Sequence, residues 1–533
     1  MLAFGLSIAL FIFWGLVGYA VLAALRIRYS SIRNMLLAPV VGLSITLLSV
    51  FWLSRSGLPV IGFGITLSIV LLVVSIGAVW HFHPITPLRH YLPFAGVFLL
   101  ALFFTGRPLL EFGFNWLSFS NDDFANYALG AQRILNHGFF DIPDSYQLVN
   151  GLDYSLTYWF FNLGVRPASE MLNAWTSSLT KGVLLPDKIF MPLIMALHLV
   201  LISSVGALVY QTRRFRSAAL MSCVMLSLSA LTSLGALYQL ISQVGGLALL
   251  VGCVTILLRP FDDARVPSRL RYGTLTALLV SALFIMYPEV LPFLVLAFGL
   301  YWVLGVIRQR LILRPMLITL SMAAVVTLAM LNSYTPIALV FLLQQATAGL
   351  ALTNLQTMLF PYYLLPSGLA NLWGFQSITG LSPEPLLSIS ILLGGLLLLV
   401  AVGVSFWQSW RLKPVAIMAI VMFGLGFRLF FQRSDFGLFK LAMFIQPFML
   451  ATIVIAWFEL IKKPVWRVTP LLLLALAGLG VQTFYVTQSS GSLHGIGSGL
   501  IEVPGASVWK INDEYKALLE ANESRAIVLD TSN

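Results

Sequence analysis

Fourteen apolar runs, each about as long as a membrane-crossing helix, constrain this chain of 533 residues more than any other feature. A helix needs about 20 consecutive apolar residues to cross the hydrocarbon core of a bilayer. The sequence therefore predicts an all-α polytopic membrane protein with about 14 transmembrane helices. The predicted spans are 2–25, 35–53, 59–80, 92–109, 189–210, 217–234, 236–258, 272–287, 289–307, 315–332, 386–408, 414–431, 438–458 and 468–487.

The composition agrees with this prediction and excludes several other classes of protein. Hydrophobic residues make up 59% of the chain and charged residues only 10%, whereas soluble domains have about 25% charged residues. A soluble enzyme and a disordered chain are therefore excluded. The net charge of +11 would suggest a nucleic-acid partner in a soluble chain, but here it reports on membrane sidedness, and no nucleic acid is expected.

The charges are distributed unequally between alternate connections. Counted on the predicted spans, 19 of the 31 lysines and arginines fall on the side of the first connection, together with three of the 20 acids. Basic residues accumulate in cytoplasmic loops, so this side is assigned to the cytoplasm. We therefore expect a multi-pass protein of the cytoplasmic membrane, with both termini and the longest loops on the outer side.

Three long outer segments divide the chain into blocks. We expect a four-span block at 1–106, an outer loop with interfacial helices at 107–188 and spans five to ten at 189–332. A second outer loop at 333–385, with interfacial or re-entrant helices, precedes spans eleven to fourteen at 386–487. An outer tail covers 488–533, with a helix at 510–521 and a short strand at 525–530. Loops of this length are usually functional.

The first outer loop contains the strongest candidate for chemistry. A helical pattern begins at Asp122 and should end at His137-Gly138, with Asn126, Gln132, Arg133 and Asn136 on its polar face. Two adjacent carboxylates, Asp122 and Asp123, stand at its head. They could act as a general base or bind a divalent cation with a phosphate. Alternatively, acids in a first helical turn merely stabilise the helix, by about 0.3–1 kcal/mol each.

The run Asp122-Asp123-Phe124, followed by Tyr127, Arg133, His137-Gly138-Phe139 and Pro143, resembles the acidic motif of the GT-C superfamily of membrane glycosyltransferases. The resemblance covers about 40 residues tightly and the layout of spans and outer loops loosely. In the superfamily this loop usually follows the first span, whereas here it follows the fourth, which suggests a divergent branch. The resemblance implies transfer of a sugar from a polyprenyl-phosphate donor on the outer side, in cell-envelope glycan synthesis or modification, with Asp122 or Asp123 as the base.

Other polar residues at the outer boundary are secondary candidates. Arg428, Arg433 and Lys440 could hold the donor phosphate, with Asp435 orienting the basic groups, or they could be snorkelling anchors. Glu289 is a candidate second acid, or the polar residue of a solvated turn. The candidates for sugar binding are Tyr238, Gln239, Gln243 and His137. Gln239 and Gln243 would share a helix face and could instead join helices, and His137 could simply cap its helix.

The remaining expectations concern cofactors, partners and alternative functions. No cofactor is required by the sequence, and although a divalent cation could take part, no residue can be assigned as a metal ligand because no His/Asp cluster has strong ligand spacing. The expected partners are a polyprenyl-phosphate-linked sugar, a glycan or lipid-linked acceptor and the lipid bilayer. The alternatives are a polysaccharide polymerase or O-antigen ligase, and a flippase or transporter of lipid-linked sugar. Few ionisable groups at mid-membrane depth and no inverted repeat speak against the transporter.

Overall fold

The computed structural model describes residues 1–27, 31–84, 88–119, 122–158, 166–210, 216–258, 266–308, 313–352 and 360–491. Every element in these ranges is a helix. By length and composition, eleven helices can cross a membrane, and the number rises to 13 if each of two bent pairs is one span. The chain is therefore a polytopic membrane protein, as predicted.

The eleven helices lie at or near the predicted positions. They are α1 (Leu2–Ala24), α2 (Ser31–Arg55), α3 (Val60–Phe82), α4 (Leu88–Gly106), α10 (Pro186–Val209), α14 (Val266–Met286), α15 (Leu291–Ile307), α16 (Leu313–Leu331), α19 (Leu386–Trp410), α20 (Pro414–Phe431) and α23 (Pro464–Gly491). A short 3-10 turn, η4 (Pro288–Val290), leads into α15.

Three predicted spans differ in detail from the observed helices. The run 217–234 is a pair, α11 (Arg216–Ser227) and α12 (Ala230–Leu237), bent by 53°, and the run 438–458 is α21 (Asp435–Phe444) and α22 (Gln446–Leu460), bent by 47°. Pro447 sits in the first turn of α22, where its missing N–H costs nothing. The third run, 236–258, is the helix α13 (Ile241–Leu257), which begins later than predicted and has 17 residues, all of them buried.

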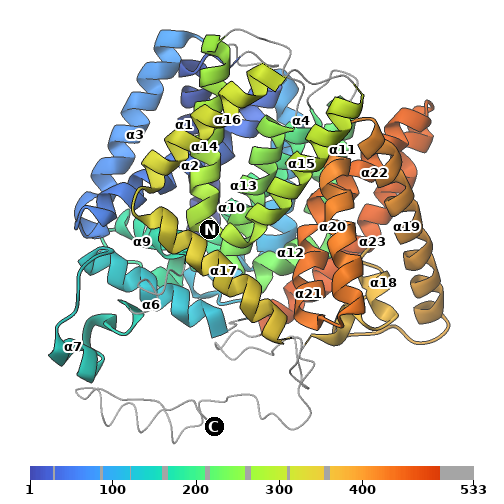
Figure 1. Cartoon of the computed structure of the whole chain (residues 1–533). Helices are drawn as coiled ribbons and strands as arrows, with labels where there is room; N and C mark the ends of the chain where they lie inside the picture. Colours follow the sequence, from blue (N-terminus) through green and yellow to red (C-terminus); the bar gives the residue numbers. More distant parts are fainter. Residues whose placement is uncertain are drawn as a thin grey trace, which may run out of the picture.

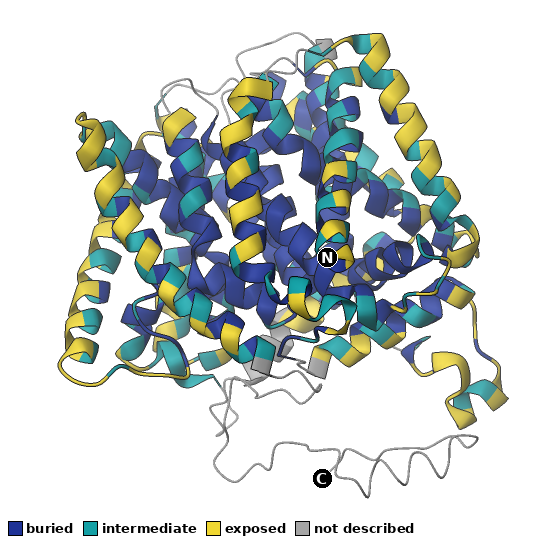
Figure 2. Ribbon diagram, turned by 180° about the vertical axis from the view of Figure 1, so that it is seen from behind, coloured by how far each residue is buried: buried dark blue, intermediate teal, exposed yellow. Residues whose placement is uncertain are grey.

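The centre of the bundle is formed by α10 and α13, which pack against each other and against α2. Figure 2 shows this buried core and the exposed residues on the outer helices. Exposed apolar side chains such as Ile69 and Val73 on α3 or Leu392 and Leu399 on α19 are suited to contact with lipid. A close crossing of α1 and α2 depends on Gly18, because a Cβ atom there would lie 1.8 Å from the Ala38 carbonyl oxygen.

The long connections gather at one end of the bundle, the lower end in Figure 1. They contain α5 (Pro108–Glu111), η1 (Gly113–Asn115), α6 (Asp122–His137), α7 (Ser145–Asn150), η2 (Leu152–Tyr154), α9 (Ala168–Ser178), α17 (Tyr334–Leu352), η5 (Pro361–Tyr363) and α18 (Ser367–Asn371). In Figure 1, α17 runs obliquely across the ends of the spans rather than parallel to them.

Hydrogen bonds at this end join the connections that the charge pattern assigns to one side. Arg55 donates to Asn332 Oδ1 at 2.9 Å, and Arg107 donates to Thr487 Oγ1 at 3.0 Å. At the other end, Glu459 forms ion pairs with Arg411 and Lys413. The alternation of the spans agrees with the prediction, while the assignment of the basic end to the cytoplasm stays a prediction.

Within the first long connection, one helix was predicted correctly and one side chain was not. The helix α6 has the expected bounds, and Gly138 follows it with a φ of +82°. Arg133, expected on the polar face, is buried instead. Its guanidinium donates to the carbonyl oxygens of Asp153 and Asp141 and pairs with Asp141 Oδ2 at 3.2 Å. The predicted tail helix at 510–521 and strand at 525–530 lie outside the described residues.

Candidate functional site

The head of α6 is fixed to the bundle by two aromatic side chains. Phe124 packs edge-on against Phe190 of α10 at 5.0 Å between ring centroids, and Tyr127 stacks on the same ring at 6.1 Å. Because Phe124 and Tyr127 are three residues apart, they share a face of the helix. Asp123 lies beside this face and is exposed. The helix therefore holds the Asp123 carboxylate at the surface of the bundle, next to a packed aromatic anchor.

An ion pair between Arg166 and Glu289 lies under α6. Arg166 precedes α9 and Glu289 lies in η4, and each side chain is only about one-fifth exposed. The guanidinium also donates to Tyr127 Oη at 3.4 Å and lies 5.0 Å from the Tyr287 ring centroid. Burial lowers the pKa of Arg166, but the Glu289 carboxylate outweighs this effect and raises it above its ordinary value. Arg166 therefore stays charged at neutral pH.

Hydroxyl groups connect this ion pair to the first turns of two other helices. Ser242 Oγ in α13 donates to Tyr127 Oη at 3.3 Å, and Ser169 Oγ in α9 lies 2.6 Å from Ser242 Oγ. Burial raises the pKa of Tyr127, so its hydroxyl stays protonated. The chain of hydroxyls fixes α6, α9 and α13 relative to one another beneath Asp123.

A second buried carboxylate, Glu170, lies one turn after Arg166. Its side chain is 5% exposed, and its Oε2 atom has no hydrogen-bond partner among the described residues. Burial raises the pKa of Glu170 to about 8, although the charge of Arg166 opposes this effect. At neutral pH the folded protein therefore keeps Glu170 mostly protonated.

Lys440 lies in the middle of α21. Phe444 of the same helix packs edge-on against Tyr287, the ring beside Arg166. The side chain is half-buried, and Nζ lies 5.3 Å from the centroid of the Phe436 ring. Asp123, Arg166, Glu170, Glu289 and Lys440 are called the charged cluster below.

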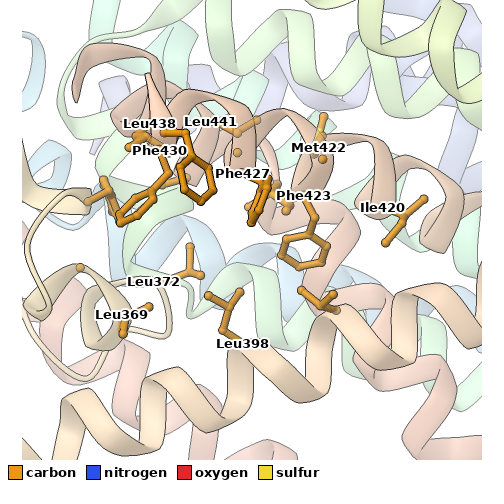
Figure 3. Close-up of a pocket in the computed structure, with 18 of the residues that line it drawn as sticks. Leu369, Leu372, Leu398, Ile420, Met422, Phe423, Phe427, Phe430, Leu438 and Leu441 are labelled. Atoms are coloured by element: carbon orange, nitrogen blue, oxygen red, sulfur yellow. The ribbon is translucent and has the colours of Figure 1, made fainter. Parts of the chain in front are cut away.

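An apolar pocket lies against the face of α21 that is turned away from Lys440 (Figure 3). It has a volume of about 660 Å³ and is lined by residues of α18, α19, α20 and α21, including Leu398, Phe423 and Phe427. Leu438 and Leu441 line it from α21, at three-residue spacing, whereas Lys440 points away from that helix face. One short helix thus separates an apolar pocket from the charged cluster.

The other predicted phosphate ligands lie elsewhere. Arg433 is exposed in the turn between α20 and α21, with a φ of 52°, and Arg428 is exposed near the end of α20. Asp435, predicted to orient these basic groups, accepts the Phe360 backbone N–H on Oδ2 at 2.9 Å, and its orienting role stays a prediction. A carboxylate in the first turn of α21 fastens the segment around Phe360.

The predicted sugar-binding residues are dispersed, and one prediction about them is wrong. Gln239 and Gln243 do not share a helix face, because α13 begins only at Ile241 and Gln239 has a φ of 62°. Gln239 donates to the Leu117 carbonyl oxygen at 2.5 Å, and Gln243 is buried with Nε2 3.4 Å from Met443 Sδ. These contacts match the alternative of joining segments.

Two further candidates have contacts with neighbouring side chains, and one cannot be judged. Tyr238 packs edge-on against Phe439 at 6.3 Å between centroids. His137 is the last residue of α6, and its Nδ1 lies 3.3 Å from Asp141 Oδ2. Asp122 begins α6, but its side chain lies outside the described residues. Arg166 and Glu170 were missed by the sequence analysis.

Neither a metal site among the described residues nor a similar known protein helps to assign the function. Among the described residues, no group of three or more His, Cys, Asp or Glu side chains could hold a metal ion, so a divalent cation stays a prediction. Comparison with protein-family models, with curated proteins and with solved structures finds no match to this chain. The functional argument therefore depends on the motif residues and the charged cluster.

Proposed function

We propose that the chain is a GT-C-type glycosyltransferase that moves a sugar from a polyprenyl-phosphate donor to an acceptor at the end of the bundle that carries α6. One observation carries the proposal. Asp123 stands at the head of the helix with the acidic motif. The helix of Lys440 packs through Phe444 against Tyr287, the ring beside Arg166, and has an apolar pocket on its other face.

In the proposed reaction, the exposed Asp123 carboxylate takes the proton from the acceptor hydroxyl as that oxygen attacks the anomeric carbon of the donor sugar. The bond between this carbon and the phosphate oxygen breaks, and polyprenyl phosphate leaves with the electron pair. Lys440 offsets the charge that develops on the leaving phosphate. Arg166 is less available for this role because Glu289 already pairs with it.

The apolar pocket suits the isoprenoid part of such a donor. Its volume of about 660 Å³ falls in the range of about 300–1,000 Å³ that is usual for small-molecule sites. The lining side chains are almost all apolar, with Tyr363 as the polar exception. A hydrocarbon tail in this pocket would bring its phosphate close to α21, the helix that carries Lys440.

The test is turnover of a synthetic polyprenyl-phosphate sugar by the purified full chain, measured as released polyprenyl phosphate. Asp122→Asn and Asp123→Asn, singly and together, should lower turnover by about a hundredfold or more, as expected for loss of a general base. Asp187→Asn is the matched control, because Asp187 is a partly exposed carboxylate at the start of α10, at the same end of the bundle. The proposal fails if the double variant is folded and keeps wild-type turnover.

The buried Arg166 favours a polymerase or O-antigen ligase as the second candidate, because such enzymes depend on arginine rather than on a paired acid. A polyprenyl-diphosphate-linked glycan is therefore included as an alternative donor. The second candidate would be favoured if the protein turned over this donor alone, if Arg166→Lys lost activity, and if the Asp variants kept it.

A further inference from the structure

A second cavity lies at the end of the bundle away from α6, where the upper ends of α1 and α3 stand in Figure 1. Its volume is about 510 Å³. Polar side chains form part of its lining, from the end of α1, the start of α2 and the end of α3. They are Tyr19, Arg26, Ser31, Asn34 and His81. Apolar residues, among them Leu22, Ile27 and Phe82, form the rest of the wall.

The polar lining is suited to an anion. No carboxylate is among the described residues that line the cavity, and no acid or hydrogen-bond acceptor holds the exposed Arg26 guanidinium in the part of the chain that the structure describes. His81 supplies a second nitrogen donor. Ser31 begins the 25-residue helix α2, so the positive end of its dipole also lies at the cavity.

One hydrogen-bond acceptor in the lining, the side-chain oxygen of Asn34, has no donor among the described residues. The Asn34 side chain donates from Nδ2 to the Ile27 carbonyl oxygen at 3.1 Å, which fixes the orientation of the amide. Its Oδ1 atom is buried and accepts no hydrogen bond from the described residues. Because this oxygen is not accessible to solvent, Asn34 shapes the wall of the cavity, and the charged contacts to a ligand come from Arg26 and His81.

The surroundings place the cavity at a membrane boundary. The face of α3 next to it has exposed apolar side chains, such as Val73 and Ile76, and ends in Trp80, which is 78% exposed and directly precedes His81. Tryptophan is enriched where hydrocarbon meets headgroups. The charge asymmetry assigns this end to the cytoplasmic leaflet, whose anionic lipids attract basic residues.

We propose that this cavity binds the headgroup of an anionic glycerophospholipid, such as phosphatidylglycerol. Arg26 and His81 contact the phosphate. The apolar wall of Leu22, Ile27 and Phe82 receives the first part of the acyl chains, which is why a lipid fits better than free phosphate. The site is separate from the charged cluster and does not depend on the proposed function.

The test is lipid binding to the full chain in detergent, measured by native mass spectrometry across a titration of phosphatidylglycerol. A basic residue beside an anionic lipid contributes roughly a fivefold change in affinity. Arg26→Gln should therefore weaken binding about fivefold, and Arg26→Gln with His81→Gln should weaken it further. Arg89→Gln is the matched control, because Arg89 is an exposed arginine at the same end, in the first turn of α4, outside the cavity lining.

Three comparisons make the proposal refutable. Phosphatidylcholine binding as tightly as phosphatidylglycerol would overturn it, and so would equal retention of phosphatidylglycerol by the Arg26/His81 double variant and the Arg89 control. Displacement of bound lipid by millimolar inorganic phosphate would show a phosphate site rather than a lipid site. If Arg26→Gln does not fold, His81→Gln and Arg26→Lys serve instead, with weaker and unchanged binding expected, respectively.

Discussion

Replacing Glu170 by glutamine tests the unusual state of this carboxylate without any assumption about function. Glutamine keeps the size and polarity of the side chain and removes its ionisation. Glu170 is 5% exposed, and its pKa in the folded protein is about 8, against an ordinary value of 4.5. The unfolded chain therefore loses this proton at lower pH than the folded protein does.

The sign and size of the effect follow from linkage. Between pH 4.5 and pH 8 the folded protein holds the Glu170 proton and the unfolded chain has released it, so the free energy of unfolding falls as pH rises through this window. The fall ends above the folded pKa. A difference of about 3.5 in pKa, at about 1.4 kcal/mol for each unit, corresponds to a loss of about 5 kcal/mol. Glu170→Gln should lack this loss.

The assay is denaturant-induced unfolding of the detergent-solubilised chain, followed by tryptophan fluorescence at a series of pH values across the window. The wild type should lose stability as pH rises, and Glu170→Gln should be flatter by several kcal/mol and more stable than the wild type at the alkaline end. Glu111→Gln is the control, because Glu111 is an exposed glutamate of α5. Parallel pH profiles for the wild type and Glu170→Gln would refute the assignment of a buried, protonated Glu170.

Two further predictions concern packing and the partly buried ion pair. Arg166→Met leaves the Glu289 carboxylate without its partner and should cost up to about 3–5 kcal/mol, the value for a fully buried pair, whereas adding Glu289→Gln should restore most of that loss. The same unfolding assay measures both, and a double variant no more stable than the single one would contradict the pairing. Gly18→Ala should prevent stable folding, since its Cβ would overlap a backbone oxygen of α2 at 1.8 Å. Gly15→Ala is the control, because a Cβ atom at Gly15 would lie 3.9 Å from its nearest neighbour, Cγ of Pro39. This variant should unfold at the same temperature as the wild type.

The elements that sequence predicted well are those with local signals. The helix α6 was located to the residue because its apolar residues recur at helical spacing and His137-Gly138 ends it. Hydropathy located the spans but missed two bends, since both halves of each bent pair are apolar. Local signals for the breaks were nonetheless present. Ser229 caps α12 by accepting the Thr232 backbone N–H at 3.3 Å, and Pro447 marks the start of α22.

Arg133 and the glutamines show where local patterns fail. Helical spacing places Arg133 with the polar residues of α6, but the carbonyl groups that receive its guanidinium come from residues that follow the helix and fold back. Gln239 lies in an apolar run that hydropathy extends too far towards the N-terminus. Its positive φ places it outside α13. A periodic pattern in the sequence cannot reveal that one residue adopts the left-handed conformation.

The charged cluster was only half predictable because its members meet through long-range contacts. Arg166 and Glu289 are 123 residues apart in the chain, so spacing alone could not pair them. A usable signal did exist. Arg166 and Glu170 stand only four residues apart in a chain with only 20 acids, and a base and an acid so close together are uncommon in an apolar protein.

Lys440 provides the sharpest test of how the cluster and the proposed reaction fit together. Arg166 is already paired with Glu289, so Lys440 is the cation of the charged cluster that is left to act on a ligand. In the proposed reaction Asp123 gains a proton while the leaving phosphate gains a negative charge, which Lys440 offsets. Lys440→Met removes this compensation and should lower kcat/KM about a hundredfold, whereas Lys440→Arg keeps the charge and should retain part of the activity. Wild-type kcat/KM in a folded Lys440→Met variant would separate the cluster from the transfer step.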